Sequence, residues 1–297
     1  MAWELVRIMR IRHWIKNLFV FAPLVFSLRF LEPMALLSGS LAAMAFCFIS
    51  SFCYIINDIA DKEKDRLHPG KKDRPVASGK LSPVTALVFA MIVLAAALAV
   101  AFCVSWQVAA AVAGYVVLSL CYSFFLKHLV ITDVVVIAIG FLVRIIAGAL
   151  AVGVVVSNWL LLSALFIALF LGFGKRRHDM MLLANGNAHR PVLEHYTVEL
   201  LNALIIISVT LSVITYSLYT LSADTISRFH TNCLIYTVPL VVYGIFRYMY
   251  IIFKKDGGGD PAEVVLGDKN ILVVIMLWGV SVISILYLGY IGLGVLP

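Results

Sequence analysis

The stretch NDIADKEKDRLHPGKKDRP at residues 57–75 is the part of the sequence richest in groups that could do chemistry, with five carboxylates and six lysines or arginines. On a helix, at 100° per residue, four oxygen-bearing side chains fall within one arc of about 100°. They are Asn57, Asp58, Asp61 and Asp65. Hard oxygen ligands in such a ladder suit Mg²⁺, which also keeps waters and substrate phosphates in its shell. A solvated charged loop that caps a transmembrane helix is the alternative that spacing alone leaves open.

Basic side chains follow this ladder of carboxylates. Lys71, Lys72 and Arg74 come directly after a His-Pro-Gly sequence that predicts the end of the helix. Lysine and arginine are the usual partners of phosphate oxygens. We therefore expect these three residues to hold a polyanion from the side opposite the carboxylates.

A second polar cluster, GFGKRRHDM at residues 172–180, is mainly basic. On a helix its Lys175, His178 and Asp179 share one face, which predicts a binding role for these three side chains. Arg176 and Arg177 are explained equally well by an ordinary positively charged loop at the membrane surface. We keep Arg176 as a candidate for substrate binding.

The elements that must position these residues are membrane helices. Hydrophobic residues make up 63% of the 297 residues, charged residues only 13%, and the mean hydropathy is +1.02, which excludes an ordinary soluble domain. Crossing the bilayer as a helix takes about 20 apolar residues, and continuous runs of this length exclude a β-barrel. Nine stretches qualify, near 17–32, 34–56, 83–103, 106–126, 130–152, 158–173, 199–221, 232–253 and 270–294.

The distribution of basic residues predicts the orientation. If the N-terminus is cytoplasmic, 20 of the 23 lysines and arginines lie on the cytoplasmic side. The polar sequence is then confined to three cytoplasmic segments, 57–82, 174–198 and 254–269, in a single domain over 1–297. Topology explains most of the net charge of +7, so no nucleic-acid partner is expected. The chemistry is predicted at the cytoplasmic face.

Two charged residues fall within one predicted span. Arg144 lies inside it, where a charge costs about 2.5–3.5 kcal/mol on insertion scales and rarely stands without a partner. Asp133 lies eleven residues earlier, about 16 Å away by helical rise, so the two cannot pair directly. Each is expected to face the substrate cavity, Asp133 near its mouth and Arg144 deeper. An ion pair with another helix is the structural alternative.

The two ends of the chain add further candidates. Arg10, Lys16 and Asn17 are expected to close the cavity from the N-terminal side, unless they only anchor the chain at the interface beside Trp14. In DPAE at residues 260–263, Asp260 has the position of a helix N-cap followed by proline. We therefore interpret Asp260 as structural rather than catalytic.

The sequence NDIADKEKDRLHPGKKDRPVASGKLS resembles the first signature of the UbiA superfamily of intramembrane prenyltransferases, NDxxDxxxD followed by a basic stretch and RPxxxG. This resemblance implies nine helices around a lateral cavity. It also implies that Asn57, Asp58, Asp61 and Asp65 bind a diphosphate through Mg²⁺, with the three aspartates catalytic. YSFFLK at 122–127 resembles the family's YSxxLK element, which implies that Tyr122 and Lys127 lie with Asp133 at the mouth.

Aromatic prenyltransferases of the superfamily carry a second Asp-rich motif where this chain has the basic GFGKRRHDM. One acidic and one basic cluster suit a substrate pair with additional phosphates. Residues 7–27, 171–180 and 246–272 resemble the branch of polyprenyl-phosphate phosphoribosyltransferases. That branch implies phosphoribosyl diphosphate as donor, a decaprenyl-type phosphate as acceptor and a bacterial inner membrane location, and we place Lys175 of the basic cluster among the candidate catalytic residues. An aromatic prenyltransferase and a non-enzymatic lipid-phosphate carrier are the alternatives.

Overall fold

The computed structural model describes residues 2–67, 70–184, 191–254 and 259–291, and within these residues all regular structure is helical. In this described part of the chain, eight helical segments are long and apolar enough to cross a membrane. They are α3 (Pro33–Ala60), α5 (Pro83–Val104), α6 (Trp106–Phe124), α7 (Thr132–Val152), α8 (Asn158–Ala184), α9 (Val198–Leu221), α11 (Val238–Lys254) together with the 3-10 helix η5 (Cys233–Thr237) that precedes it, and α13 (Lys269–Tyr290). Shorter helices connect them: α1 (Ala2–Ile8), α2 (Ala22–Phe26), α4 (Lys62–Leu67), α10 (Ala223–Phe229) and α12 (Pro261–Gly267). The all-helical membrane fold predicted from the sequence is confirmed.

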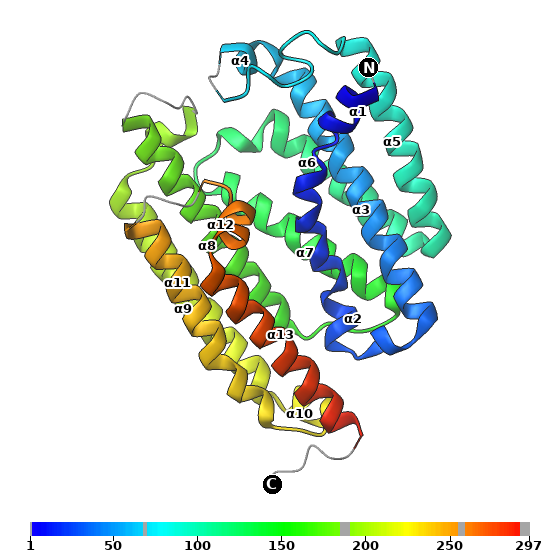
Figure 1. Cartoon of the computed structure of the whole chain (residues 1–297), viewed down its shortest axis with the longest axis vertical. Helices are drawn as coiled ribbons and strands as arrows, with labels where there is room; N and C mark the ends of the chain where they lie inside the picture. Colours follow the sequence, from blue (N-terminus) through cyan, green and yellow to red (C-terminus); the bar gives the residue numbers. More distant parts are fainter. Residues whose placement is uncertain (1, 68–69, 185–190, 255–258, 292–297) are drawn as a thin grey trace.

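The predicted count of nine spans is not confirmed, because the first of them is no continuous helix. Residues 11–31 form a 3-10 helix, η1 (Ile11–Phe21), then α2, then a second short 3-10 helix, η2 (Arg29–Leu31). Left-handed backbone at Arg10 and Leu28, with φ of 53° and 58°, directly precedes η1 and η2 respectively. A 3-10 helix rises about 2.0 Å per residue, more than an α-helix. The segment therefore runs down beside α3 and α7 as a thin, extended element (Figure 1).

Two groups of helices make up the packed interior. In the first, α3 and α5 approach closely through fully buried alanines, among them Ala42, Ala45, Ala86 and Ala90. Small residues allow such an approach, and they are typical of helix pairs in membranes. The second group surrounds Leu201 on α9 and includes side chains of α8, α11 and α13. Helices α7 and α8 join the two groups.

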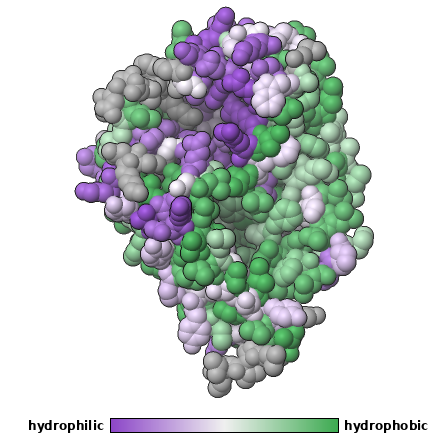
Figure 2. All heavy atoms as spheres, viewed as in Figure 1, coloured by the Kyte–Doolittle hydropathy of each residue, from purple (hydrophilic) through white to green (hydrophobic). Residues whose placement is uncertain are grey.

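Polar residues gather at one end of the molecule. Figure 2 shows hydrophilic side chains over the end that carries α4, and hydrophobic side chains over most of the remaining flank on the same face. Helix α3 extends past its predicted apolar end to Ala60, and α8 continues past residue 173 to Ala184. Both predicted polar clusters are thus carried to this end by long helices. We call it the polar end.

Candidate active site

Asp58 and Asp65 meet at a single arginine. Asp58 lies in the last turn of α3 and Asp65 in α4, and both side chains are nearly fully buried. The Nη1 of Arg74 donates to Asp58 Oδ1 at 3.1 Å and to Asp65 Oδ2 at 2.6 Å. Arg10 adds an ion pair to Asp58 from the N-terminal segment. Two carboxylates from successive helices therefore share one cation at the polar end.

Asp61 turns away from this pair. It caps the end of α3, and its two carboxylate oxygens each accept a hydrogen bond of 3.0 Å from Nζ of Lys127. The sequence predicted Asn57, Asp58, Asp61 and Asp65 as one ladder on an uninterrupted helix. The helix ends at Ala60 and restarts at Lys62, so the carboxylates divide into a pair and a single group. The side chain of Asn57 is half-buried beside them.

The carboxylate oxygens of this region are chemically suited to bind a divalent cation. Asp58 and Asp65 together bind one cationic group, the Nη1 end of Arg74. Carboxylate oxygens are also the ligands that Mg²⁺ prefers. In the described part of the chain, no three acidic, cysteine or histidine side chains converge as a complete metal site. Magnesium typically takes one or two protein carboxylates and completes its shell with water and phosphate oxygens. Two converging carboxylates are sufficient for that mode of binding.

The basic residues of this region differ in their surroundings. Lys71 places Nζ 3.9 Å from Asp65, whereas Lys72 is exposed. Burial lowers the pKa of the Arg10 guanidinium, Asp58 opposes that shift, and the nearby Arg74 adds to it. Arg10 and Arg74 therefore lie close enough to act on each other while both face Asp58.

Arg176 of the second cluster is buried in a polar network. Its guanidinium donates to Asp133 at 2.5 Å, to Asp179 at 3.3 Å and to the hydroxyl of Tyr122 at 3.4 Å. Asp133 is fully buried and also accepts a 2.8 Å hydrogen bond from Tyr196, whose hydroxyl accepts one from the backbone of Ile131. The ion pair between helices that the sequence left open is thus present for Asp133. The sequence analysis did not identify Tyr196, because this tyrosine lies in a polar stretch and no motif distinguishes it from its neighbours.

The other basic residues of the cluster point in different directions. Arg177 donates to the side chain of Asn202 and to the backbone oxygen of Ile252, each at 2.9 Å, which ties α8 to α9 and α11. His178 lies against Gly259, where an added Cβ would come within 2.9 Å of its Nε2. Lys175 is near enough to Asp260 to lower the pKa of that carboxyl. The cluster therefore combines buried structural arginines with a lysine and a histidine that face the start of α12.

Asp260 caps α12 as the sequence predicted, with Oδ1 accepting a 2.9 Å hydrogen bond from the backbone of Ala262. Its Oδ2 lies 3.6 Å from Nδ1 of His13. Lys16 and Lys175 also act on this carboxyl group. Sequence reasoning did not place Asp260 among these residues, because the N-terminal segment and α12 are brought together only by the fold.

Arg144 lies deeper in the molecule, 5% exposed. It donates to Asn17 at 2.7 Å, to Ser50 at 3.2 Å, to the hydroxyl of Tyr115 at 2.8 Å and to the backbone of Gly140 at 2.8 Å. Its guanidinium carbon is also 4.5 Å from the centre of the Tyr115 ring. No carboxylate of the described residues pairs with it. The prediction that it does not pair with Asp133 agrees with these contacts.

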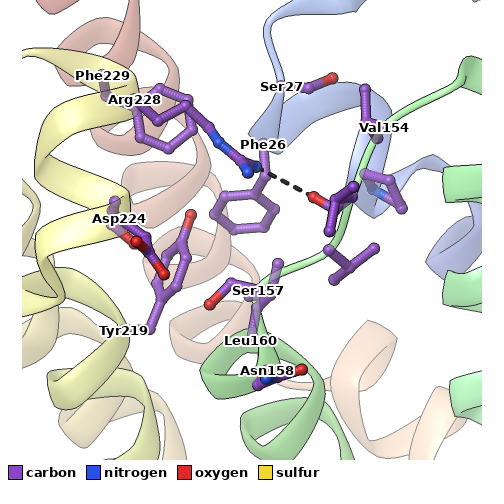
Figure 3. A pocket seen from close by; sticks show the side chains of 14 residues that line it. Phe26, Ser27, Val154, Ser157, Asn158, Leu160, Tyr219, Asp224, Arg228 and Phe229 are labelled. Carbon is purple, nitrogen blue, oxygen red and sulfur yellow. Dashed lines mark hydrogen bonds between the residues drawn. The ribbon is translucent and has the colours of Figure 1, made fainter.

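A pocket of about 180 Å³ lies at the other end of the molecule. Figure 3 shows Phe26, Tyr219, Asp224 and Arg228 around it, with Arg228 donating to the backbone oxygen of Val155 at 3.1 Å. Helix α10, which carries Asp224 and Arg228, is remote from α4 in Figure 1. None of the predicted catalytic residues lines this pocket, so the candidate site remains at the polar end.

Comparison with known sequences identifies the family. Residues 18–264 match the UbiA prenyltransferase family. The chain is 32% identical to the decaprenyl-phosphate phosphoribosyltransferase of Mycolicibacterium smegmatis, over 92% of this chain and 89% of that protein. It is also 32% identical to the decaprenyl-phosphate phosphoribosyltransferase of Corynebacterium glutamicum, over 97% of this chain and 88% of that protein.

Solved structures share the fold at lower sequence identity. A UbiA homologue from Archaeoglobus fulgidus bound to GPP and Mg²⁺ superposes with a TM-score of 0.73 at 22% identity, covering 95% of this chain and 99% of that chain. A digeranylgeranylglyceryl phosphate synthase structure gives a TM-score of 0.64 at 18% identity, covering 94% and 99%. The chain is a multi-pass membrane protein and a transferase, and it belongs to the UbiA prenyltransferase family.

Proposed function

We propose that this protein is a Mg²⁺-dependent transferase that moves 5-phosphoribose from phosphoribosyl diphosphate to a polyprenyl phosphate of the decaprenyl type. The reaction takes place at the cytoplasmic face of the bacterial inner membrane, within a single domain. The polar end, with Asp58 and Asp65 on one shared cation, is the observation that carries the proposal. The names of the mycobacterial and corynebacterial relatives support the choice of substrates.

The donor side of the reaction uses the first motif. Asp58 and Asp65, with Asn57 and Asp61 beside them, would hold Mg²⁺, which supplies positive charge to the departing diphosphate. Arg10, Arg74 and Lys127 now neutralise these carboxylates. With the carboxylates engaged in holding the metal, these basic residues would be available to bind the phosphate oxygens, together with Lys71 and Lys72.

The reaction itself needs no covalent nucleophile from the protein. The bond between the anomeric carbon of ribose and the diphosphate oxygen breaks, and its electron pair leaves with the diphosphate. An oxygen of the lipid phosphate forms the new bond to the same carbon. The protein must hold this oxygen in line and neutralise the developing negative charge. Basic side chains at the polar end are suited to both tasks.

The second cluster favours a phosphoribosyl donor over a prenyl diphosphate. Where a second acidic motif would bind another metal, this chain has Lys175 and His178 facing the start of α12. Direct lysine and histidine contacts suit the further phosphates of the phosphoribosyl donor and the lipid acceptor. Tyr122, Asp133, Arg176 and Asp179 would position this side of the site through their shared network.

Purified protein supplied with labelled phosphoribosyl diphosphate, decaprenyl phosphate and Mg²⁺ tests the proposal. We expect a labelled lipid that requires both substrates and disappears when EDTA removes the metal. If no labelled lipid forms, while a prenyl diphosphate and a phenolic acceptor react, the protein is an aromatic prenyltransferase. If polyprenyl phosphate is bound or moved across vesicles with no product, the protein is a carrier instead.

A further inference from the structure

Asp260 brings a carboxylate into a basic corner between the N-terminal segment and α8. We call His13, Lys16, Lys175 and Asp260 the corner site. The carboxylate lies 3.6 Å from Nδ1 of His13, and it interacts electrostatically with both lysines. Helix α12 packs on η1 at this point. Residues from three segments distant in the sequence thus form one cluster, with a single carboxylate near two lysines.

The negative charge of Asp260 is not needed for its role as a helix cap. Only Oδ1 accepts the capping hydrogen bond, from Ala262. A neutral asparagine caps a helix about as well as an aspartate. Burial alone would raise the pKa of Asp260, but Lys16, the Ala262 hydrogen bond and Lys175 outweigh burial and lower it. The group is therefore ionised at neutral pH, and its charge serves the neighbouring cations.

Lys16 is the member of the corner site with unfilled hydrogen-bonding capacity. Its side chain is half-buried. Burial is the main cause that lowers the pKa of Lys16, whereas the charge of Asp260 acts to raise it. Within the described ranges, Lys16 has no hydrogen bond or ion pair in the usual distance limits. An ammonium group offers three donors, and at a half-buried position water can reach fewer of them than in solution. An anion with several oxygens would satisfy them better than the single carboxylate nearby.

The position of Lys16 indicates which anion this is. Lys16 directly precedes Asn17 and the apolar run of η1 that packs beside α7, so in the sequence it lies at the junction between the polar N-terminal residues and this apolar run. A lipid that keeps its chain in hydrocarbon must hold its phosphate at this boundary. The carboxylates Asp58 and Asp65, which suit the metal and the diphosphate, are paired with other cations, Arg10 and Arg74.

We propose that the corner site binds the phosphate group of the polyprenyl phosphate acceptor, and that the carboxylate of Asp260 occupies the place of this phosphate until the lipid arrives. The inference rests on the proposed function, because it names the site of one of its two substrates. Asp260 is then a competitor for the acceptor, and Lys16, whose donors the carboxylate leaves unfilled, is the main residue that binds the phosphate.

Two variants of the full-length protein, Lys16→Met and Asp260→Asn, test this assignment. In phospholipid nanodiscs without donor, Lys16→Met should weaken the binding of radiolabelled decaprenyl phosphate by about tenfold or more. Asp260→Asn keeps the helix cap and should tighten this binding several-fold. In the transfer assay, the KM for the lipid should move in the same directions, while the KM for phosphoribosyl diphosphate stays unchanged. Lys64→Met and Glu63→Gln, which alter exposed charges on α4, are the matched controls.

Each other outcome has a distinct meaning. If Lys16→Met raises only the KM for phosphoribosyl diphosphate, the corner site holds the 5-phosphate of the donor, and the inference is wrong. If Asp260→Asn weakens lipid binding or leaves it unchanged, the carboxylate does not compete with the lipid. Failure of the wild-type protein to transfer phosphoribose would refute the proposed function, whereas the binding measurement would still report on the corner site.

Discussion

Asp133 on α7 and Arg176 on α8 form an ion pair inside the molecule, with Nε of the arginine 2.5 Å from the carboxylate and exposed fractions of 0% and 2%. Tyr196 donates to the second carboxylate oxygen of Asp133. A buried pair with its remaining hydrogen bonds satisfied fixes the geometry of two helices, because either charge alone would be strongly unfavourable there. This pair sets how α8 presents Lys175 and His178 to the start of α12.

Removing one partner should therefore destabilise the fold. We expect Asp133→Ala to lower the free energy of unfolding by about 3–5 kcal/mol, since Arg176 would stay buried with the more exposed Asp179 as its remaining acidic partner among the described residues. Denaturant titration in detergent measures this. Glu63→Gln is the control, because its ion pairs with Lys62 and Arg66 are exposed and should contribute nothing measurable. Equal stability of the two variants would contradict a structural role for Asp133.

The close packing of the N-terminal segment on α7 predicts a second effect. A Cβ at Gly148 would lie 2.0 Å from the backbone oxygen of Val20, whereas a Cβ at Gly114 on α6 meets nothing within 4 Å. Gly148→Ala should therefore push η1 away and reduce both thermal stability and transfer activity. Gly114→Ala should leave activity unchanged and raise stability slightly, since alanine favours helix over glycine by about 1 kcal/mol. Similar behaviour of the two variants would show that η1 does not pack as described.

The spans could be predicted because lipid requires long apolar helices, and this requirement is visible in every stretch from 34–56 onward. The segment 17–32 is apolar enough to suggest a ninth helix. In the structure this segment is broken into η1, α2 and η2, and the backbone of Val20 in η1 lies close to Gly148 on α7, more than a hundred residues away, a contact that no local pattern reveals. Hydropathy gives the composition of a membrane segment but not its backbone conformation.

In the candidate site, too, local spacing predicts some contacts, whereas others depend on residues distant in the sequence. Asp58 and Asp65 were predicted to lie together, and they do share Arg74. The separation of Asp61 depends on Lys127, which comes 66 residues later, and on the end of α3 at Ala60. Helical spacing predicts which side chains share a face only while the helix continues. The place of Asp260 beside His13 could not be predicted, because it depends on how the two ends of the chain meet.

Arg144 should show opposite effects on stability and activity. It is buried with no acidic partner among the residues described, and a charge at such a position costs about 2.5–3.5 kcal/mol. Arg144→Met should therefore keep or increase thermal stability while greatly reducing turnover in the transfer assay. Arg144→Lys should also lose activity, since an ammonium group cannot reproduce the hydrogen bonds to Asn17 and Tyr115. A stable, fully active Arg144→Met variant would refute a role in the reaction.

His13 predicts part of the acid sensitivity of the fold. Burial, followed by the charge of Lys16, lowers the pKa of His13 from 6.5 to about 4. Between these two values the unfolded chain binds a proton that the folded protein does not, so the free energy of unfolding falls as the pH falls from 6.5 towards 4. Melting temperatures across this range should fall less in His13→Gln than in the wild type. The exposed His128 provides the control, and an identical slope in His13→Gln and wild type would contradict the prediction.

The paired carboxylates predict a metal dependence specific to their position. Asp58→Asn and Asp65→Asn should each reduce turnover by about 10–100-fold or more and raise the Mg²⁺ concentration needed for half-maximal activity, because each removes one charged ligand of the same cation. Folding should persist, since asparagine can still accept a hydrogen bond from Arg74. Glu63→Gln removes a carboxylate of the same segment that faces solvent, and it should leave the Mg²⁺ dependence unchanged. Titration of activity with Mg²⁺ after EDTA treatment measures all three variants. An unaltered Mg²⁺ requirement in both aspartate variants would show that the metal, if needed, binds elsewhere.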